Sequence, residues 1–323
     1  MHTGLKITVF AAALAATFGT AYGAGQVLDP VTGEAEPAEH SAHGSQQRKA
    51  DGHEGHAEHG GGPSEAPGGL QVSEKGFALD LKTPRVEAGK DAELRFAIVD
   101  EDTGRNVTAF RREHGKELHL IVASRDLATY RHLHPVRAAD GTWSISAELP
   151  KAGGYRVFAD FTPQAKSASG LTLGADLEVS GKSKPEPLPA ADRTATVDGY
   201  EVTLNGRLRA GTGSELRLDV SKDGKPVTDL QPYLGAYGHL VALRSGDLAY
   251  LHVHPNGEPG DGRTKPGPEV SFTATAPSKG AYRLFLDFRH DGKVRTAAFT
   301  VHVGEASERP TDPEGRKPAE HQH

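Results

Sequence analysis

Hydrophobic and polar residues alternate along this chain in short runs, which is the pattern of half-buried strands. Phe77, Leu79 and Leu81 are separated by single residues, and similar runs recur over residues 70–181 and 194–304. Turns rich in Gly, Asp or Pro separate the runs. We expect about seven antiparallel strands and no helix in each segment. At ~110 residues per segment, this predicts an immunoglobulin-like β-sandwich.

The two segments also repeat each other in sequence. His119 and His132 are 13 residues apart, and so are His239 and His252. Each segment contains a Tyr-Arg-x-Phe-x-Asp-Phe block further along the chain. Matching spacings across several blocks indicate a duplicated domain. The expected fold class is therefore all-β, with two tandem sandwiches.

The start of the chain predicts export. Residues 7–28 carry no charged side chain, and Ala21-Tyr22-Gly23 fits a small-x-small cleavage site. A cleaved signal peptide and a retained membrane anchor both remain open, so the protein is expected to be secreted or held at the extracellular face of the cytoplasmic membrane. The expected organisation is a signal or anchor at 1–28, a disordered His-rich spacer at 29–69, repeat 1 at 70–181, a Pro-rich linker at 182–193, repeat 2 at 194–304 and a disordered tail at 305–323.

A hairpin in repeat 1 is expected to gather three histidines on one face of a sheet. With a two-residue loop at 126–127, paired residue numbers sum to 253, so His119 lies opposite His134. His132 and His134 are two positions apart on one strand and therefore share a face. Directly opposed side chains have Cβ atoms ~4.5–5.5 Å apart. The three imidazoles are then close enough to bind one small cation.

Repeat 2 predicts an equivalent cluster. A loop at 246–247 makes paired numbers sum to 493, which places His239 opposite His254, with His252 on the same face. Three neutral imidazoles suit Zn(II) or Cu(II), and apolar neighbours on this face favour the neutral form. Each repeat is thus expected to bind its own ion. Alternatively, these histidines are core residues bonded to carbonyls or acids, repeated because the core is repeated.

Two further groups of residues are candidate ligands. Asp160 and Asp287 occupy equivalent places in the Tyr-Arg-x-Phe-x-Asp-Phe block, where each is either a fourth ligand or the acceptor of a ligand His N–H. A structural contact with Arg or a loop is the alternative for both. The expected spacer adds five histidines with His-x2-His spacing, typical of loose chelation or of a solvating linker: His40, His43, His53, His56 and His59.

Composition excludes several classes of site. The 323 residues include 37 Lys and Arg against 43 Asp and Glu, for a net charge of −6, so we expect no nucleic-acid partner. Without Cys, the chain has no disulfide, thiolate metal site or cysteine nucleophile. Its single Met is residue 1, which excludes thioether ligation of Cu(I). No Gly-x-Ser-x-Gly, P-loop or His-Glu-x-x-His motif is present, so we expect no enzyme.

Five blocks of the chain match the pattern of a known group of proteins: Lys116–Leu120, Arg125–Leu127, His132–Pro135, Leu234–His239 and His252–Pro255. In these blocks the chain resembles exported two-repeat proteins of actinomycete bacteria, often labelled heavy-metal-associated or secreted. The resemblance covers roughly 70–304, the N-terminal segment and the His-rich spacer. More loosely, the architecture is similar to YtkA-like and periplasmic copper-resistance β-sandwich domains, although the chain lacks the Met and Cys ligands of such copper carriers.

Together these features predict an exported, non-enzymatic metal-binding protein of the cell envelope that buffers or delivers Cu(II) or Zn(II). Its partners would be the metal ion and, as recipient, a membrane metal transporter. Contact with the membrane itself would be made through the N-terminal segment only. The alternative is a tandem β-sandwich scaffold or adhesion module of the cell surface with no metal role.

Overall fold

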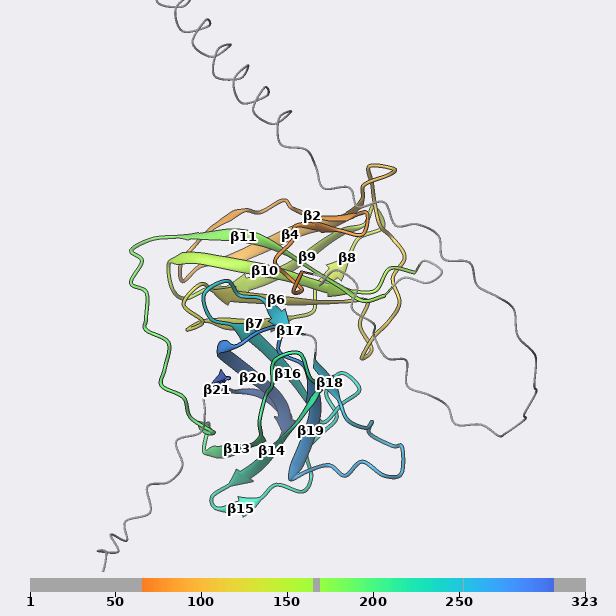
Figure 1. Cartoon of the computed structure of the whole chain (residues 1–323). Helices are drawn as coiled ribbons and strands as arrows, with labels where there is room; N and C mark the ends of the chain where they lie inside the picture. The colour runs from red at the N-terminus through yellow and green to blue at the C-terminus, as the bar shows by residue number, and fades with distance from the viewer. Residues whose placement is uncertain (1–65, 165–168, 252, 305–323) are drawn as a thin grey trace, which may run out of the picture. The chain divides into compact units, whose positions relative to one another are not determined.

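The computed structural model describes residues 66–164, 169–251 and 253–304, which all belong to one compact unit, Gly61–His323. These residues form 21 strands and no helix, so the described part of the chain has no helix that could cross a bilayer. Among these described residues, strands of four or more residues number seven in each repeat. The predicted all-β class with two tandem immunoglobulin-like sandwiches is confirmed (Figure 1).

Repeat 1 contains two sheets. One has the strand order β1-β2-β4-β9-β8, with β5 beside β4, and the other has the order β3-β11-β10-β6-β7. All strand pairs described in this repeat are antiparallel except the parallel pair β3 and β11. The strands are β1 (Ser73–Glu74), β2 (Phe77–Leu81), β3 (Arg85–Glu87), β4 (Asp91–Asp100), β5 (Arg105–Asn106), β6 (Leu118–Ser124), β7 (Tyr130–Leu133), β8 (Val136–Arg137), β9 (Thr142–Glu148), β10 (Gly153–Phe161) and β11 (Leu171–Ser180).

Repeat 2 has the same plan. Its sheets have the orders β12-β13-β14-β19-β18, with β15 beside β14, and β17-β16-β20-β21. The strands are β12 (Thr194–Val197), β13 (Tyr200–Gly206), β14 (Ser214–Lys222), β15 (Lys225–Pro226), β16 (Gly238–Arg244), β17 (Tyr250–Leu251), β18 (Val253–Pro255), β19 (Glu269–Ala274), β20 (Gly280–His290) and β21 (Lys293–Val303).

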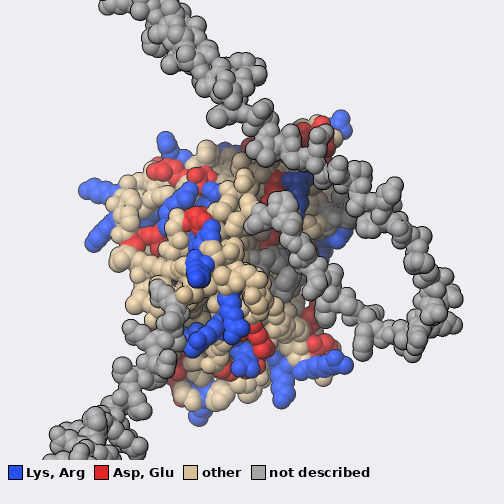
Figure 2. Space-filling view, viewed as in Figure 1, with Lys and Arg blue, Asp and Glu red and all other residues tan. Residues whose placement is uncertain are grey.

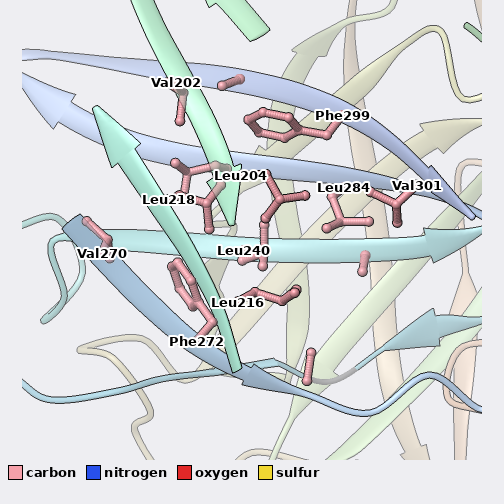
Figure 3. Packing of buried hydrophobic residues seen from close by; sticks show 14 of the residues in the cluster. Val202, Leu204, Leu216, Leu218, Leu240, Val270, Phe272, Leu284, Phe299 and Val301 are labelled. Carbon is pink, nitrogen blue, oxygen red and sulfur yellow. The ribbon is translucent and has the colours of Figure 1, made fainter. Parts of the chain in front are cut away.

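Each repeat has its own hydrophobic core between its two sheets. Along β14, Leu216, Leu218 and Val220 are buried while the residues between them face outward, as the alternation predicts. Figure 3 shows Leu216 and Leu218 in one cluster with Leu284 and Phe299 of the facing sheet. Removing such apolar surface from water is what stabilises each sandwich, at ~25 cal/mol per Å².

Equivalent tyrosines close one corner of each sandwich. The hydroxyl of Tyr155 donates to the carbonyl of Lys151 over 2.7 Å, and that of Tyr282 donates to the carbonyl of Ser278 over 2.8 Å. Both rings are buried. A buried tyrosine that bonds the backbone a few residues upstream is a corner feature of immunoglobulin-like domains. Its presence in both repeats agrees with their duplication.

A third buried cluster is shared by the two repeats. In Figure 1, β6 and β7 of repeat 1 lie beside β16 and β17 of repeat 2. The buried residues that meet here are Ile121, Ala123, Leu127, Tyr130, Phe158, Val241, Leu243, Leu248, Tyr250 and Phe285. The sheet face on which the sequence places the histidines is therefore the face between the repeats.

The predicted hairpin registers are confirmed near their loops. Leu120 pairs with Leu133 and Ala123 with Tyr130, so the numbers sum to 253. Ala242 pairs with Leu251, which gives the predicted sum of 493. The predicted two-residue loops are wrong, because the bonds that close them join residues 124 with 129 and 244 with 249. Each loop contains a leucine with positive φ, at 59° for Leu127 and 63° for Leu248. Burying both leucines between the repeats offsets the backbone cost of that conformation, ~1–2 kcal/mol.

Positive and negative side chains are interspersed over the face of the molecule seen in Figure 2. Elsewhere in repeat 1, Arg125 and Arg156 both pair with Asp176, over 2.6 and 2.8 Å. Arg156 also donates to the carbonyl of Gly69 over 2.7 Å, and Gly68 forms an isolated bridge with Tyr250. The last residues of the predicted spacer are thus tied to both repeats.

Candidate metal centre

The structure brings the three predicted histidines of repeat 1 together. His119 lies on β6, His132 on β7 and His134 directly after β7. One ring nitrogen of each lies within 4.8 Å of the others. The ring centroids are 5.3, 5.2 and 4.8 Å apart. Imidazoles that share one ion at ~2.0–2.1 Å have centroids roughly 5 Å apart, so the cluster has the dimensions of a three-His site.

The hydrogen bonds of His119 and His132 leave two ring nitrogens facing one another. Nε2 of His119 lies 3.2 Å from the carbonyl oxygen of Glu113, and Nδ1 of His132 lies 2.9 Å from Oδ2 of Asp287. A carbonyl and a carboxylate accept, so a neutral ring carries its single proton on the nitrogen that faces them. When both rings are neutral, Nδ1 of His119 and Nε2 of His132 are therefore both acceptors, although they are 3.1 Å apart. A cation bound by both nitrogens removes this repulsion, and ligands of a tetrahedral Zn(II) ion are separated by a similar ~3.3 Å.

On His119 and His134 a proton is a poor substitute for that cation. Burial, and then the charge of neighbouring histidines, lowers the pKa of His119 to about 3 and that of His134 to about 3. Both rings are therefore neutral at pH 7, which is the form that binds metal. Nε2 of His134 is buried and has no hydrogen-bond partner among the described residues. An unpartnered buried nitrogen costs ~1–3 kcal/mol, which a bound ion would offset.

His239 of repeat 2 lies beside the cluster. Its ring centroid is 6.3 Å from that of His119 and 6.0 Å from that of His132, about 1 Å more than the spacing within the cluster. Its Nε2 bonds the carbonyl of Tyr233 over 2.8 Å, and burial lowers its pKa to about 4. A cavity of about 50 Å³ is lined by His239 together with His119, His132 and Asp160. This is more than the ~10–15 Å³ that one water needs.

The two candidate aspartates have different partners. Asp287 is 2% exposed and accepts a hydrogen bond from His132 across the repeats, so its predicted role as the partner of a metal ligand stays a prediction. It also accepts from Tyr130 over 3.4 Å. Asp160 accepts from Tyr250 of repeat 2 over 3.2 Å. Each aspartate of one repeat thus bonds the equivalent tyrosine of the other repeat.

The second predicted cluster is placed only in part. His252 and the side chain of His254 lie outside the described residues, as do the spacer histidines 40, 43, 53, 56 and 59. The backbone of His254 pairs with Thr273 in β19. The predicted extension of the hairpin to pair it with His239 is therefore wrong, because the chain leaves β17 and joins the other sheet. The ion expected in repeat 2 stays a prediction.

Sequence reasoning missed His114. This exposed residue has a φ of 50° in the turn before β6, and its ring lies 5.3 Å from that of His239 and 6.3 Å from that of His119. The matching turn of repeat 2 has Leu234 in the same conformation, with a φ of 52°. Aligning these two turns would have identified a histidine that repeat 1 has and repeat 2 lacks.

The family described as Domain of unknown function (DUF8832) matches residues 71–171 and 195–305. The chain belongs to this family. Two DUF8832 copies confirm the duplication inferred from the spacing of the histidines. The first copy supplies the three clustered histidines, and the second supplies Asp287 and His239. No curated protein matches the chain in sequence.

Among solved structures, this DUF8832 chain is similar to FdeC, an Escherichia coli adhesin, with 15% identity over 72% of this chain and 65% of that one, and a TM-score of 0.23. It is also similar to InvD of Yersinia pseudotuberculosis, with 11% identity over 76% of this chain and 62% of that one, and a TM-score of 0.24. The tandem immunoglobulin repeats of Dlar are 9% identical over 70% of this chain and 97% of that one, with a TM-score of 0.19. The chain thus spans less than two thirds of both bacterial proteins.

Proposed function

We propose that the protein binds one divalent transition-metal ion, Zn(II) or Cu(II), through His119, His132 and His134. The observation that carries this proposal is the approach of Nδ1 of His119 to Nε2 of His132, 3.1 Å apart, in rings whose other nitrogens face a carbonyl and a carboxylate. Neutral rings in these tautomers repel one another there unless a cation lies between them. The unpartnered Nε2 of His134 supplies the third ligand.

The ligand types support the choice of metal. Three imidazoles with a position open toward a small cavity are a donor set of Zn(II) and Cu(II) sites. The chain has no thiolate and no internal thioether, so soft Cu(I) lacks its preferred ligands. The cavity of about 50 Å³ offers room for a water or a small exogenous ligand at the open position.

We propose further that the protein buffers or delivers this metal outside the cytoplasmic membrane and is no enzyme. The uncharged segment 7–28 supports export, and the histidines of the spacer support a role in collecting metal. The resemblance to exported actinomycete proteins labelled heavy-metal-associated is consistent with this role. A membrane metal transporter is the recipient we propose. Protease added to intact, wall-stripped cells should remove both repeats, and full protection would refute export.

Metal analysis of the untagged protein tests the binding proposal. A chromogenic chelator of moderate affinity strips weakly bound ions, and the Zn(II) or Cu(II) retained against it is counted for wild type, His132→Ala and His302→Ala. We expect wild type to retain an ion that His132→Ala loses, while His302→Ala, a change at an exposed histidine of β21, retains it. If wild type retains neither metal, the cluster is structural and the scaffold interpretation replaces this one.

A further inference from the structure

One candidate ligand of repeat 1 is held in place by repeat 2. Asp287 of β20 is the hydrogen-bond partner of His132 Nδ1, over 2.9 Å, and both side chains are almost fully buried, with exposures of 3% and 6%. We propose that the metal cluster couples the two repeats. Asp287 positions His132, and an ion bound in repeat 1 strengthens the docking of repeat 2. This inference rests on the proposed function, because it concerns the same ion.

Asp287 is well placed to fix the orientation of a ligand. Its strand is central in its sheet, and the residue lies opposite His239 on one side and Thr296 on the other. The hydroxyl of Thr296 donates to Oδ1 of Asp287 over 2.5 Å, which leaves Oδ2 directed toward His132. The carboxylate is therefore held by repeat 2 independently of any metal. It can act as a fixed reference for the imidazole across the interface.

The consequence for His132 is a defined tautomer. Donation from Nδ1 to Asp287 keeps the lone pair on Nε2, the nitrogen that faces His119. A carboxylate behind an imidazole also makes the ligating nitrogen more basic, and loss of such a partner typically weakens metal binding 10- to 100-fold. Asp287 touches no metal in this arrangement. It is a positioning residue that acts through His132.

Other contacts between the repeats lie next to this hydrogen bond. Tyr130, two residues before His132, stacks on Phe285, two residues before Asp287, with centroids 4.1 Å apart. Separating the repeats would therefore withdraw Asp287 from His132 and expose the Tyr130–Phe285 pair together. Linkage is reciprocal, so an ion that binds more tightly to the docked form stabilises docking by the same factor.

Affinity measurements on the full chain test the positioning role. Zn(II) and Cu(II) affinities are measured by chelator competition for wild type, Asp287→Asn and the matched control Asp229→Asn, the same change at the partner of His290, a His–Asp pair outside the cluster. We expect Asp287→Asn to weaken binding tenfold or more and Asp229→Asn to change it less than threefold. Equal losses in both variants would indicate a general destabilisation and overturn the assignment.

The outcomes separate this inference from the proposed function. If wild type binds neither metal, the proposed function fails first. If wild type binds the metal tightly and Asp287→Asn binds it equally well, only the coupling through Asp287 is refuted. Melting curves in excess chelator show how much stability each variant loses without metal, so a folding defect is distinguished from a ligand defect.

Hydrogen exchange in wild type tests the coupling without any substitution. Amide exchange is followed in β16 and β20 of repeat 2, with Zn(II) and with chelator. We expect bound Zn(II) to slow exchange in these strands as well as in β6 and β7 of repeat 1. In Asp287→Asn, protection should be confined to repeat 1. If Zn(II) slows exchange only in repeat 1 of the wild-type protein, the ion does not tie the repeats together and the proposal is wrong.

Discussion

Tyr130 of repeat 1 stacks face to face on Phe285 of repeat 2, with ring centroids 4.1 Å apart and planes 5° apart. Stacked and edge-on aromatic pairs add ~0.5–1.5 kcal/mol to the burial of their area. The pair lies in the shared cluster, whose residues come from both repeats. The two sandwiches therefore have a common core in addition to their own, and we expect them to unfold together.

Replacing Phe285 with Ala should uncouple the two repeats. Removal of a buried Phe typically costs ~3–5 kcal/mol, and here the loss falls on the interface. Fluorescence of Trp143, the single Trp of the chain, reports on repeat 1, whereas circular dichroism reports on both repeats. In urea, the two signals should change together in wild type and separately in Phe285→Ala. Val294→Ala, at a site that is 37% exposed, is the control. Coincident curves for Phe285→Ala would contradict a shared core.

The three-His cluster could be predicted from sequence because local rules determine it. A hairpin register fixes which residues are opposite, and a spacing of two puts His132 and His134 on one face. The loop could vary without consequence, since a four-residue loop keeps the sum of 253 that a two-residue loop predicts. The positive φ of Leu127 was not foreseen, because its burial between the repeats is what compensates for it.

The partner of His132 could not be predicted from sequence. Asp287 is 155 residues away in the chain, and its contact depends on how two sandwiches dock. Alternation identifies the faces of a strand but does not indicate what covers them. The face with the histidines was expected to have apolar neighbours, and only the structure shows that Ile121 and Tyr130 there are buried with Val241 and Phe285 of repeat 2. His254 was misplaced for a related reason, since a strand that changes sheets keeps the same alternation.

Alanine variants should distinguish a metal ligand from a structural histidine. Within the described part of the chain, Nε2 of His134 has no hydrogen-bond partner, whereas both nitrogens of His290 are bonded, to Tyr200 over 2.7 Å and to Asp229 over 2.9 Å. In chelator, His290→Ala should lose ~1–3 kcal/mol and His134→Ala less than that. With metal at a hundredfold excess over Kd, wild type and His290→Ala should each gain about 2.7 kcal/mol, and His134→Ala should gain nothing. Denaturant titrations measure the free energy of unfolding with chelator and with metal. A metal-dependent rise of that free energy in His134→Ala would exclude His134 as a ligand.

Deleting residues 40–59 should change metal stoichiometry without changing the melting of the repeats. The deleted segment contains five histidines, which we expect to bind several ions weakly because ordering a loose chain costs entropy. Equilibrium dialysis should show fewer weakly bound ions and the same tight ion. Calorimetry in chelator provides the control, since a lower melting temperature of the shortened chain would mean that the segment packs on the repeats.

As the pH is lowered, the free energy of unfolding of the metal-free protein should begin to fall before the carboxylates titrate. In the folded state the pKa is about 3 for His119 and His134 and about 4 for His239, chiefly because of burial, against an ordinary value near 6.5 in the unfolded chain. Below pH ~6.5 the unfolded state therefore binds more protons than the folded state, and each extra proton lowers the free energy of unfolding by about 1.4 kcal/mol per pH unit. Above that pH the full stability is present, and the loss continues until the folded pKa values are reached. Denaturation in chelator between pH 8 and 5 should show this slope, and His119→Gln, which cannot take up the proton, should show a shallower one. A wild-type protein equally stable at pH 7.5 and 5 would mean that these rings are not held neutral by the fold.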